Sequence, residues 1–199
     1  MDMKNGLPRT KRITYTAIVI ALAVSLRLVK YALFGPVQFV NFPGIFTIVG
    51  GVLFGPSVGI AVGFASYVFS DIMIGLPGPW TVVNAVLMAS LGLISGLIWG
   101  RNGYGKVTKI GLGIGTFVMM LAFDIVSSGI LLVMVLGGNW LYAFTIGLIG
   151  LFVPSPVSGG FMFAVGPITE ATTTILVVTI VSILIKSKTG IGRGNYVEG

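Results

Sequence analysis

Residues 80–100 read WTVVNAVLMASLGLISGLIWG, an apolar run without a charged side chain. A helix of about 20 such residues is long enough to cross the hydrocarbon core of a lipid bilayer. The tight turn Pro77-Gly78-Pro79 precedes the run, and the polar loop at 101–109 follows it. The stretch therefore predicts a transmembrane helix, and similar stretches lie on both sides of it.

Apolar runs fill most of the remaining sequence. Of the 199 residues, 55% are hydrophobic and 9% are charged, a balance that excludes a water-soluble surface. Further membrane-spanning segments are expected at 13–34, 44–55, 57–76, 110–136 and 167–185. The sequence thus predicts an all-α polytopic membrane protein whose six transmembrane helices form one compact bundle, with residues 1–199 as a single domain.

Basic residues gather on one predicted side of this bundle. With six spans, both termini and the loop at 101–109 share a side that carries ten of the twelve Lys and Arg residues. Positive charge marks cytoplasmic loops, so we predict a multi-pass cell-membrane protein with a cytoplasmic N-terminus (1–12) and a cytoplasmic C-terminal tail (186–199). A seventh span at 141–153 would move the basic tail outside. That run is instead predicted to be an interfacial or re-entrant part of an outer loop.

Three acidic residues, Asp71, Asp124 and Glu170, lie inside the apolar runs. A charged group in hydrocarbon is costly, so each is expected to face the bundle interior or a wet cavity. Asp71 and Glu170 fall in the predicted outer half of the membrane, where they can bind a ligand or hold Arg27. Asp124 falls near mid-membrane and is expected to fix helix packing. A buried ion pair or a backbone hydrogen bond is the alternative for all three acids.

Other polar and aromatic residues are predicted to line the same outward-opening space. Arg27 could pair with Asp71, bind an anionic group of a ligand, or extend its head to the interface. Trp80 and Trp140 could stack on a flat heterocycle or anchor the spans at the headgroups, and nearby amides could add hydrogen bonds. The predicted ligand contacts are Arg27, Asn41, Asp71, Trp80, Asn84, Asn139, Trp140 and Glu170.

Several kinds of catalytic chemistry are excluded by the residue inventory. The chain has no Cys and no His, which excludes Ser-His or Cys-His nucleophile pairs, thiol chemistry and the usual zinc or haem ligands. Residues 100–106 fit the first seven positions of a phosphate-binding loop, but Val107 stands where Ser or Thr is required. The chain is therefore predicted to be no enzyme and to hold no metal or cofactor. Any ATP would be hydrolysed by another subunit.

Small residues recur at four-residue spacing in three of the predicted spans. Gly92 and Gly96, followed by Gly100 at the same spacing, form one such pair, and Gly111 and Gly115 form another. Small residues at this spacing let helix backbones approach closely, and the glycines are expected to pack within the bundle. For the third pair, Ala17 and Ala21, contact with a partner protein is an alternative to internal packing.

Several motifs follow one another in a fixed order: LFGPSVG at 53–59, Asp71 at the end of the next helix, Pro79-Trp80-Thr81 at the start of the one after, then Gly92 and Gly96. This order resembles the substrate-binding S components of energy-coupling factor (ECF) vitamin transporters. The Ala17-x-x-x-Ala21 pair also looks like that family's contact for its transmembrane coupling subunit.

The resemblance implies a six-helix S component in a prokaryotic plasma membrane, with both termini cytoplasmic. It implies that the chain binds a vitamin or vitamin precursor near the outer face. It also implies a partner module of one transmembrane coupling protein and two cytoplasmic ATPases, which use ATP. Ala17 and Ala21 would contact the coupling protein. The long apolar segment at 137–166 departs from the family pattern.

Two other classes of function stay open on the sequence. A stand-alone proton-coupled carrier or channel would use Asp71, Asp124 and Glu170 as a proton relay. A structural membrane scaffold would need neither a ligand nor these acids. Ligand retention and flux through the isolated protein separate the three classes.

Overall fold

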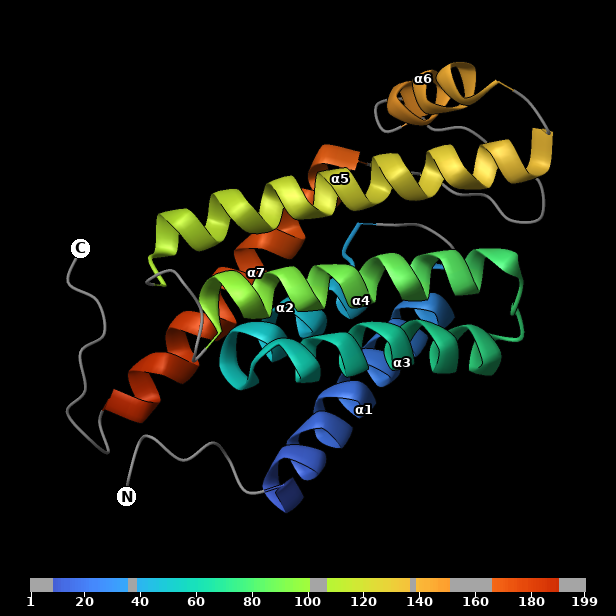
Figure 1. Cartoon of the computed structure of the whole chain (residues 1–199). Helices are drawn as coiled ribbons and strands as arrows, with labels where there is room; N and C mark the ends of the chain where they lie inside the picture. Colours follow the sequence, from blue (N-terminus) through green and yellow to red (C-terminus); the bar gives the residue numbers. More distant parts are fainter. Residues whose placement is uncertain (1–8, 36–38, 101–106, 137–138, 151–165, 190–199) are drawn as a thin grey trace.

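The described part of the chain is entirely helical outside its turns (Figure 1). The computed structural model describes residues 9–35, 39–100, 107–136, 139–150 and 166–189. Within them lie α1 (Arg9–Phe34), α2 (Phe42–Phe54), α3 (Pro56–Ile74), α4 (Pro79–Trp99), α5 (Lys109–Leu136), α6 (Trp140–Gly150) and α7 (Gly166–Thr189). The predicted all-α class is confirmed. Most of the two predicted tails, residues 1–8 and 190–199, lies outside the described residues.

Five of the described helices are long and apolar enough to cross a membrane: α1, α3, α4, α5 and α7. The apolar helix α2 has 13 residues. At 1.5 Å per residue it rises about 20 Å, less than the roughly 30 Å of the hydrocarbon core. The chain is thus a multi-pass membrane protein, while the count of six crossings and the cytoplasmic position of the termini stay predictions.

The turn between α2 and α3 depends on the Gly55-Pro56 pair. Gly55 has φ 97°, a left-handed conformation that side chains disfavour. Pro56 then occupies the first turn of α3, where its missing N–H removes no helical hydrogen bond. At its other end, α3 stops at Gly75, which has φ 81°. Glycine at both ends therefore lets α3 fold back sharply between α2 and α4.

α3 and α4 pack backbone to backbone along a seam of glycines. A Cβ added to Gly92 would overlap the carbonyl oxygen of Gly59, and one added to Gly96 would lie 2.5 Å from the Cα of Pro56. The predicted internal packing is therefore confirmed for Gly92 and Gly96. Gly115 also packs internally, against the ring of Trp99. For Gly111 the described residues offer only Thr108 of its own chain segment within 4 Å of an added Cβ, so its helix contact stays a prediction.

α2 forms the centre of the bundle, in contact with α1, α3, α4 and α7. Its side chains Ile45 and Ile48 are fully buried and belong to the same core as Met88, Met120 and Val177. A short helix can be surrounded in this way because each of these neighbours is longer than α2. The central position of α2 explains why its amino end, and the residue that caps it, lie inside the protein.

The helix ends sort into two groups (Figure 1). The starts of α1 and α5 and the ends of α4 and α7 lie toward the left, whereas the α3–α4 turn lies at the right. Basic residues such as Arg9, Lys11, Lys109 and Lys186 therefore gather at one end of the bundle. This is the arrangement that the predicted orientation requires.

α6 is a helix of 11 residues that packs on α5 (Figure 1). It rises about 16 Å, too little to span a bilayer. Gly129 of α5 receives the ring of Phe144, so closely that an added Cβ would lie 2.7 Å from that ring. The predicted segment 141–153 thus forms a short helix against α5, with its last residues outside the described ranges.

Candidate functional site

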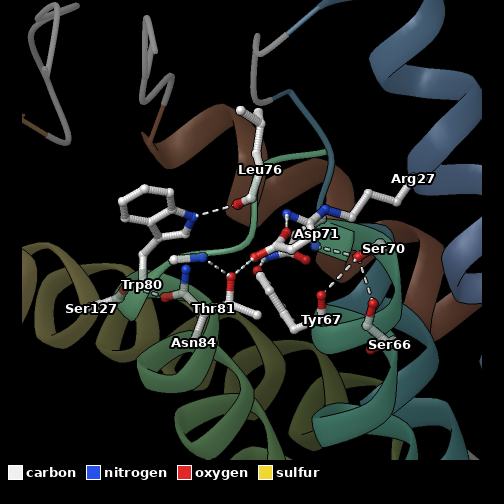
Figure 2. Close-up of polar contacts among 12 residues, drawn as sticks. Arg27, Ser66, Tyr67, Ser70, Asp71, Leu76, Trp80, Thr81, Asn84 and Ser127 are labelled. Atoms are coloured by element: carbon white, nitrogen blue, oxygen red, sulfur yellow. Dashed lines mark hydrogen bonds and ion pairs between the residues drawn. The ribbon is translucent and has the colours of Figure 1, made fainter. Parts of the chain in front are cut away.

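An ion pair joins α1 to α3 inside the bundle. Arg27 Nη2 lies 2.6 Å from Asp71 Oδ1, and the two side chains are 16% and 5% exposed. The guanidinium also donates to Ser70 Oγ and lies 4.6 Å from the centroid of the Tyr67 ring (Figure 2). Of the roles predicted for Arg27, pairing with Asp71 is the one that the structure shows. The two buried charges compensate each other and have further polar neighbours.

The second oxygen of Asp71 fastens the α3–α4 turn. The Thr81 hydroxyl donates to Asp71 Oδ2 at 2.6 Å and accepts from the Gly78 N–H at 3.1 Å. Beside it, the Trp80 indole N–H donates to the Leu76 carbonyl at 3.0 Å (Figure 2). Trp80 remains 43% exposed. The turn therefore holds an exposed indole ring next to the buried ion pair.

Tyr67 extends this network toward α2 and α7. Its hydroxyl accepts from Asn41 Nδ2 at 3.3 Å. Asn41 Oδ1 accepts from the Gly44 N–H at 2.9 Å and so caps α2, while the Asn41 backbone N–H donates to Thr173 Oγ1 at 3.1 Å. Both ends of the Asn41 side-chain amide thus form hydrogen bonds within the protein. Its predicted contact with a ligand stays a prediction.

Two further polar contacts connect the remaining helices. The Ser127 hydroxyl of α5 donates to Asn84 Oδ1 of α4 (Figure 2). The carboxyl groups of Asp124 on α5 and Glu170 on α7 are close enough to interact electrostatically, and the charge of Asp124 also acts on Tyr67. Glu170 is fully buried, and neither of its carboxyl oxygens has a hydrogen-bond partner among the described residues.

The acidic residues group differently from the sequence-based expectation. Asp71 and Glu170 were expected together as ligand groups, with Asp124 apart as a packing residue. The structure instead pairs Asp71 with Arg27 and places Asp124 beside Glu170. Asp124 thus belongs to the same polar interior as the other two acids.

Asn139 and Trp140 lie on α6, apart from this network. Asn139 Oδ1 accepts from the Leu141 N–H at 2.9 Å and so caps the helix. Trp140 is 59% exposed and stacks on Phe144, with ring centroids 6.2 Å apart. No contact among the described residues joins either side chain to Arg27, Asp71 or Asn41. Their predicted ligand contacts therefore remain untested.

Three residues outside the predicted ligand set hold the network together: Tyr67, Thr81 and Thr173. The sequence carried a signal for two of them. Tyr67 lies four residues before Asp71 and so shares a helix face with it. Thr173 lies three residues after Glu170 and likewise shares its face. Nothing in the sequence indicated that the Thr81 hydroxyl would reach back to Asp71.

Comparison with known proteins gives one match. A family model described as the ECF transporter, substrate-specific component, matches residues 11–142, which is more than half of the chain. No characterised protein and no solved structure gave a significant match. The matched segment contains Arg27, Asp71, Trp80 and Asn84, and it ends before Glu170.

Proposed function

The chain belongs to the substrate-specific components of ECF transporters, and on that basis we propose that it captures a vitamin or vitamin precursor from the extracellular side. Components of this kind are the substrate-binding subunits of a membrane complex that also contains a transmembrane coupling protein and ATPase subunits. The substrate is bound and moved, not chemically changed. In our proposal, two partner ATPases hydrolyse the ATP that drives uptake.

The observation that carries this proposal is the buried polar network inside an apolar bundle. It connects α1, α2, α3, α4 and α7 through Arg27, Asp71, Thr81, Tyr67 and Asn41. Ionisable groups at membrane depth are expensive to bury and mark ligand or ion sites. The α3–α4 turn beside this network lies at the end of the bundle away from the basic residues (Figure 1). With the predicted orientation, the network faces the outside.

Trp80 and Asn84 are the groups best placed to touch a ligand. The indole N–H of Trp80 donates a hydrogen bond to the Leu76 carbonyl, which fixes the ring in place. The exposed part of the ring remains available for stacking on a ligand. Asn84 lies one turn further along α4 and is only partly buried. Its amide nitrogen has no hydrogen bond among the described residues, since Ser127 contacts only the oxygen.

The outer face of α1 fits the predicted contact with the coupling protein. Ala17 and Ala21 are exposed, as is Ile18, whereas Val19 and Ala23 face the bundle. Two small residues one turn apart leave room for a neighbouring helix to approach closely. We therefore assign this face of α1 to the coupling protein.

Reconstitution tests the proposed function directly. Protein purified in mild detergent should retain a vitamin-sized molecule that mass spectrometry identifies. In liposomes, uptake of that molecule should require the coupling protein, the ATPases and ATP. Flux through the isolated chain that follows a pH gradient would instead support the stand-alone carrier. Absence of both ligand and flux would support a scaffold.

A further inference from the structure

Glu170 is a buried acid whose only side-chain neighbour of polar character among the described contacts is another carboxyl group, that of Asp124. It lies near the start of α7 and is 0% exposed, and neither Oε1 nor Oε2 has a hydrogen-bond donor within the described residues. A buried carboxylate without donors costs far more than a paired one. Apart from the neighbouring Asp124 carboxyl group, no described residue supplies a positive charge or a hydrogen-bond donor to its oxygens.

Asp124 adds a second carboxyl group at the same place. Its side chain interacts with that of Glu170 across the α5–α7 interface. Two close carboxylates cannot both stay ionised unless a cation lies between them, and otherwise they share a proton. Asp124 is less completely buried than Glu170.

The basic residues of the interior do not supply the missing cation. Arg27 is paired with Asp71 and Ser70. Lys30 lies close to Arg27 on α1, and it makes no hydrogen bond to Glu170, whose oxygens are both unpartnered. Arg27 and Asp71 therefore compensate each other, while Asp124 and Glu170 leave a net negative site.

Unpartnered hydroxyls extend the polar surface beside the acids. Thr174 lies one turn after Glu170 on the same face of α7, and its Oγ1 is buried without a partner. Its methyl group would lie 3.9 Å from a Cβ on Gly113 of α5, which places it at the α5–α7 interface. Thr116, one turn from Gly113, also has a buried Oγ1 without a partner. The α5–α7 interface thus contains two buried hydroxyl groups without a hydrogen-bond partner, in addition to the two carboxyl groups.

We propose that Asp124 and Glu170 together bind a cationic nitrogen of the transported substrate. A protonated amine, or a positively charged ring nitrogen with an adjacent amino group, would supply both the charge and the donors that the pair lacks. This inference rests on the proposed function and narrows it. The substrate is a basic or zwitterionic small molecule, and anionic vitamins are disfavoured because Asp124 and Glu170 are both acids.

The first test uses wild-type protein and needs no substitution. The molecule that is retained on purification is identified by mass spectrometry, and its affinity is measured by tryptophan fluorescence. If none is retained, thiamine and pyridoxamine, which are cationic, are titrated against pyridoxine, riboflavin and pantothenate, which are uncharged or anionic. Pyridoxamine and pyridoxine differ mainly in an amine that replaces a hydroxyl. A cationic ligand is expected in either case.

The second test removes the charges of the pair. In Glu170→Gln and Asp124→Asn, affinity for the cationic ligand should fall about 100-fold or more, since each leaves a buried charge without its partner. Glu198→Gln removes a carboxylate from the C-terminal tail and should leave affinity unchanged. Elution volume and thermal unfolding in detergent show whether each variant is folded.

The outcomes separate this inference from the proposed function. A neutral or anionic ligand that is taken up with the coupling module and ATP overturns the cationic site and leaves the transport function in place. Folded Gln and Asn variants with wild-type affinity also overturn it, and would show the pair to be a packing contact that shares a proton. If no probe binds and uptake never depends on the module, both proposals fail.

Discussion

The Thr81 hydroxyl donates a 2.6 Å hydrogen bond to Asp71 Oδ2, across the turn between α3 and α4. The other oxygen of the same carboxylate holds Arg27 of α1 at 2.6 Å. One carboxylate therefore fixes three helices relative to one another. It also fixes the turn that carries Trp80, so a change at Asp71 acts on packing and on the candidate ligand surface together.

Asp71→Asn should destabilise the protein strongly. The substitution leaves the Arg27 guanidinium without its counter-charge, which for a buried ion pair costs about 3–5 kcal/mol. Thermal or denaturant unfolding in detergent measures the loss. Replacing both partners, as in Arg27→Met with Asp71→Leu, should recover much of it, because no unpaired charge remains. A single variant as stable as wild type would show that Asp71 does not hold Arg27.

Part of this site could be predicted from the sequence, because charges in apolar runs need partners. Asp71 was an expected partner of Arg27 for that reason. Asp124 and Glu170 were not expected to meet, since their positions along the chain placed them at different depths. Because α7 crosses α5 at an angle (Figure 1), a residue near the start of α7 lies beside the middle of α5. Crossing angles depend on packing, which hydropathy does not reveal.

The role of Asn41 illustrates a second limit. Its place in a loop between apolar runs suggested a free amide for a ligand. The structure makes it the cap of α2, with Tyr67 and Thr173 as further partners. A cap preference of Asn before a helix that begins with Phe42-Pro43 is readable in the sequence. The sequence does not indicate that α2 lies at the centre of the bundle, and for that reason it does not predict that the cap of α2 is buried.

Gly92→Ala should disturb the α3–α4 seam. The added methyl group would overlap the backbone of Gly59, so the helices must separate at a cost of about 1–3 kcal/mol or more. Gly113→Ala is the matched control, because its Cβ would lie 3.7 Å from Val178, an ordinary contact distance. Unfolding curves in detergent should show a loss for the first variant only. Equal stability of the two would argue against the tight seam.

Trp80→Ala should weaken ligand binding without unfolding the protein. The ring is partly exposed and contributes little to the core, while stacking on a flat ligand is worth about 0.5–1.5 kcal/mol. Affinity measured by calorimetry should therefore fall by up to about 10-fold. Tyr142→Ala, at an exposed aromatic residue of α6, is the control. Wild-type affinity of the Trp80→Ala variant would show that Trp80 does not contact the ligand.

Ala17→Trp combined with Ala21→Trp should abolish transport while ligand binding stays at the wild-type level. Both side chains point away from the bundle, so bulky rings there would block the approach of the coupling protein without disturbing the α1 core contacts at Val19 and Ala23. Leu33→Trp, at an exposed position near the other end of α1, controls for bulk on the same helix. Co-purification with the coupling module and ATP-dependent uptake are measured for each variant. Normal uptake by the double variant would place the coupling contact elsewhere, whereas loss of binding would show that these positions act on the fold.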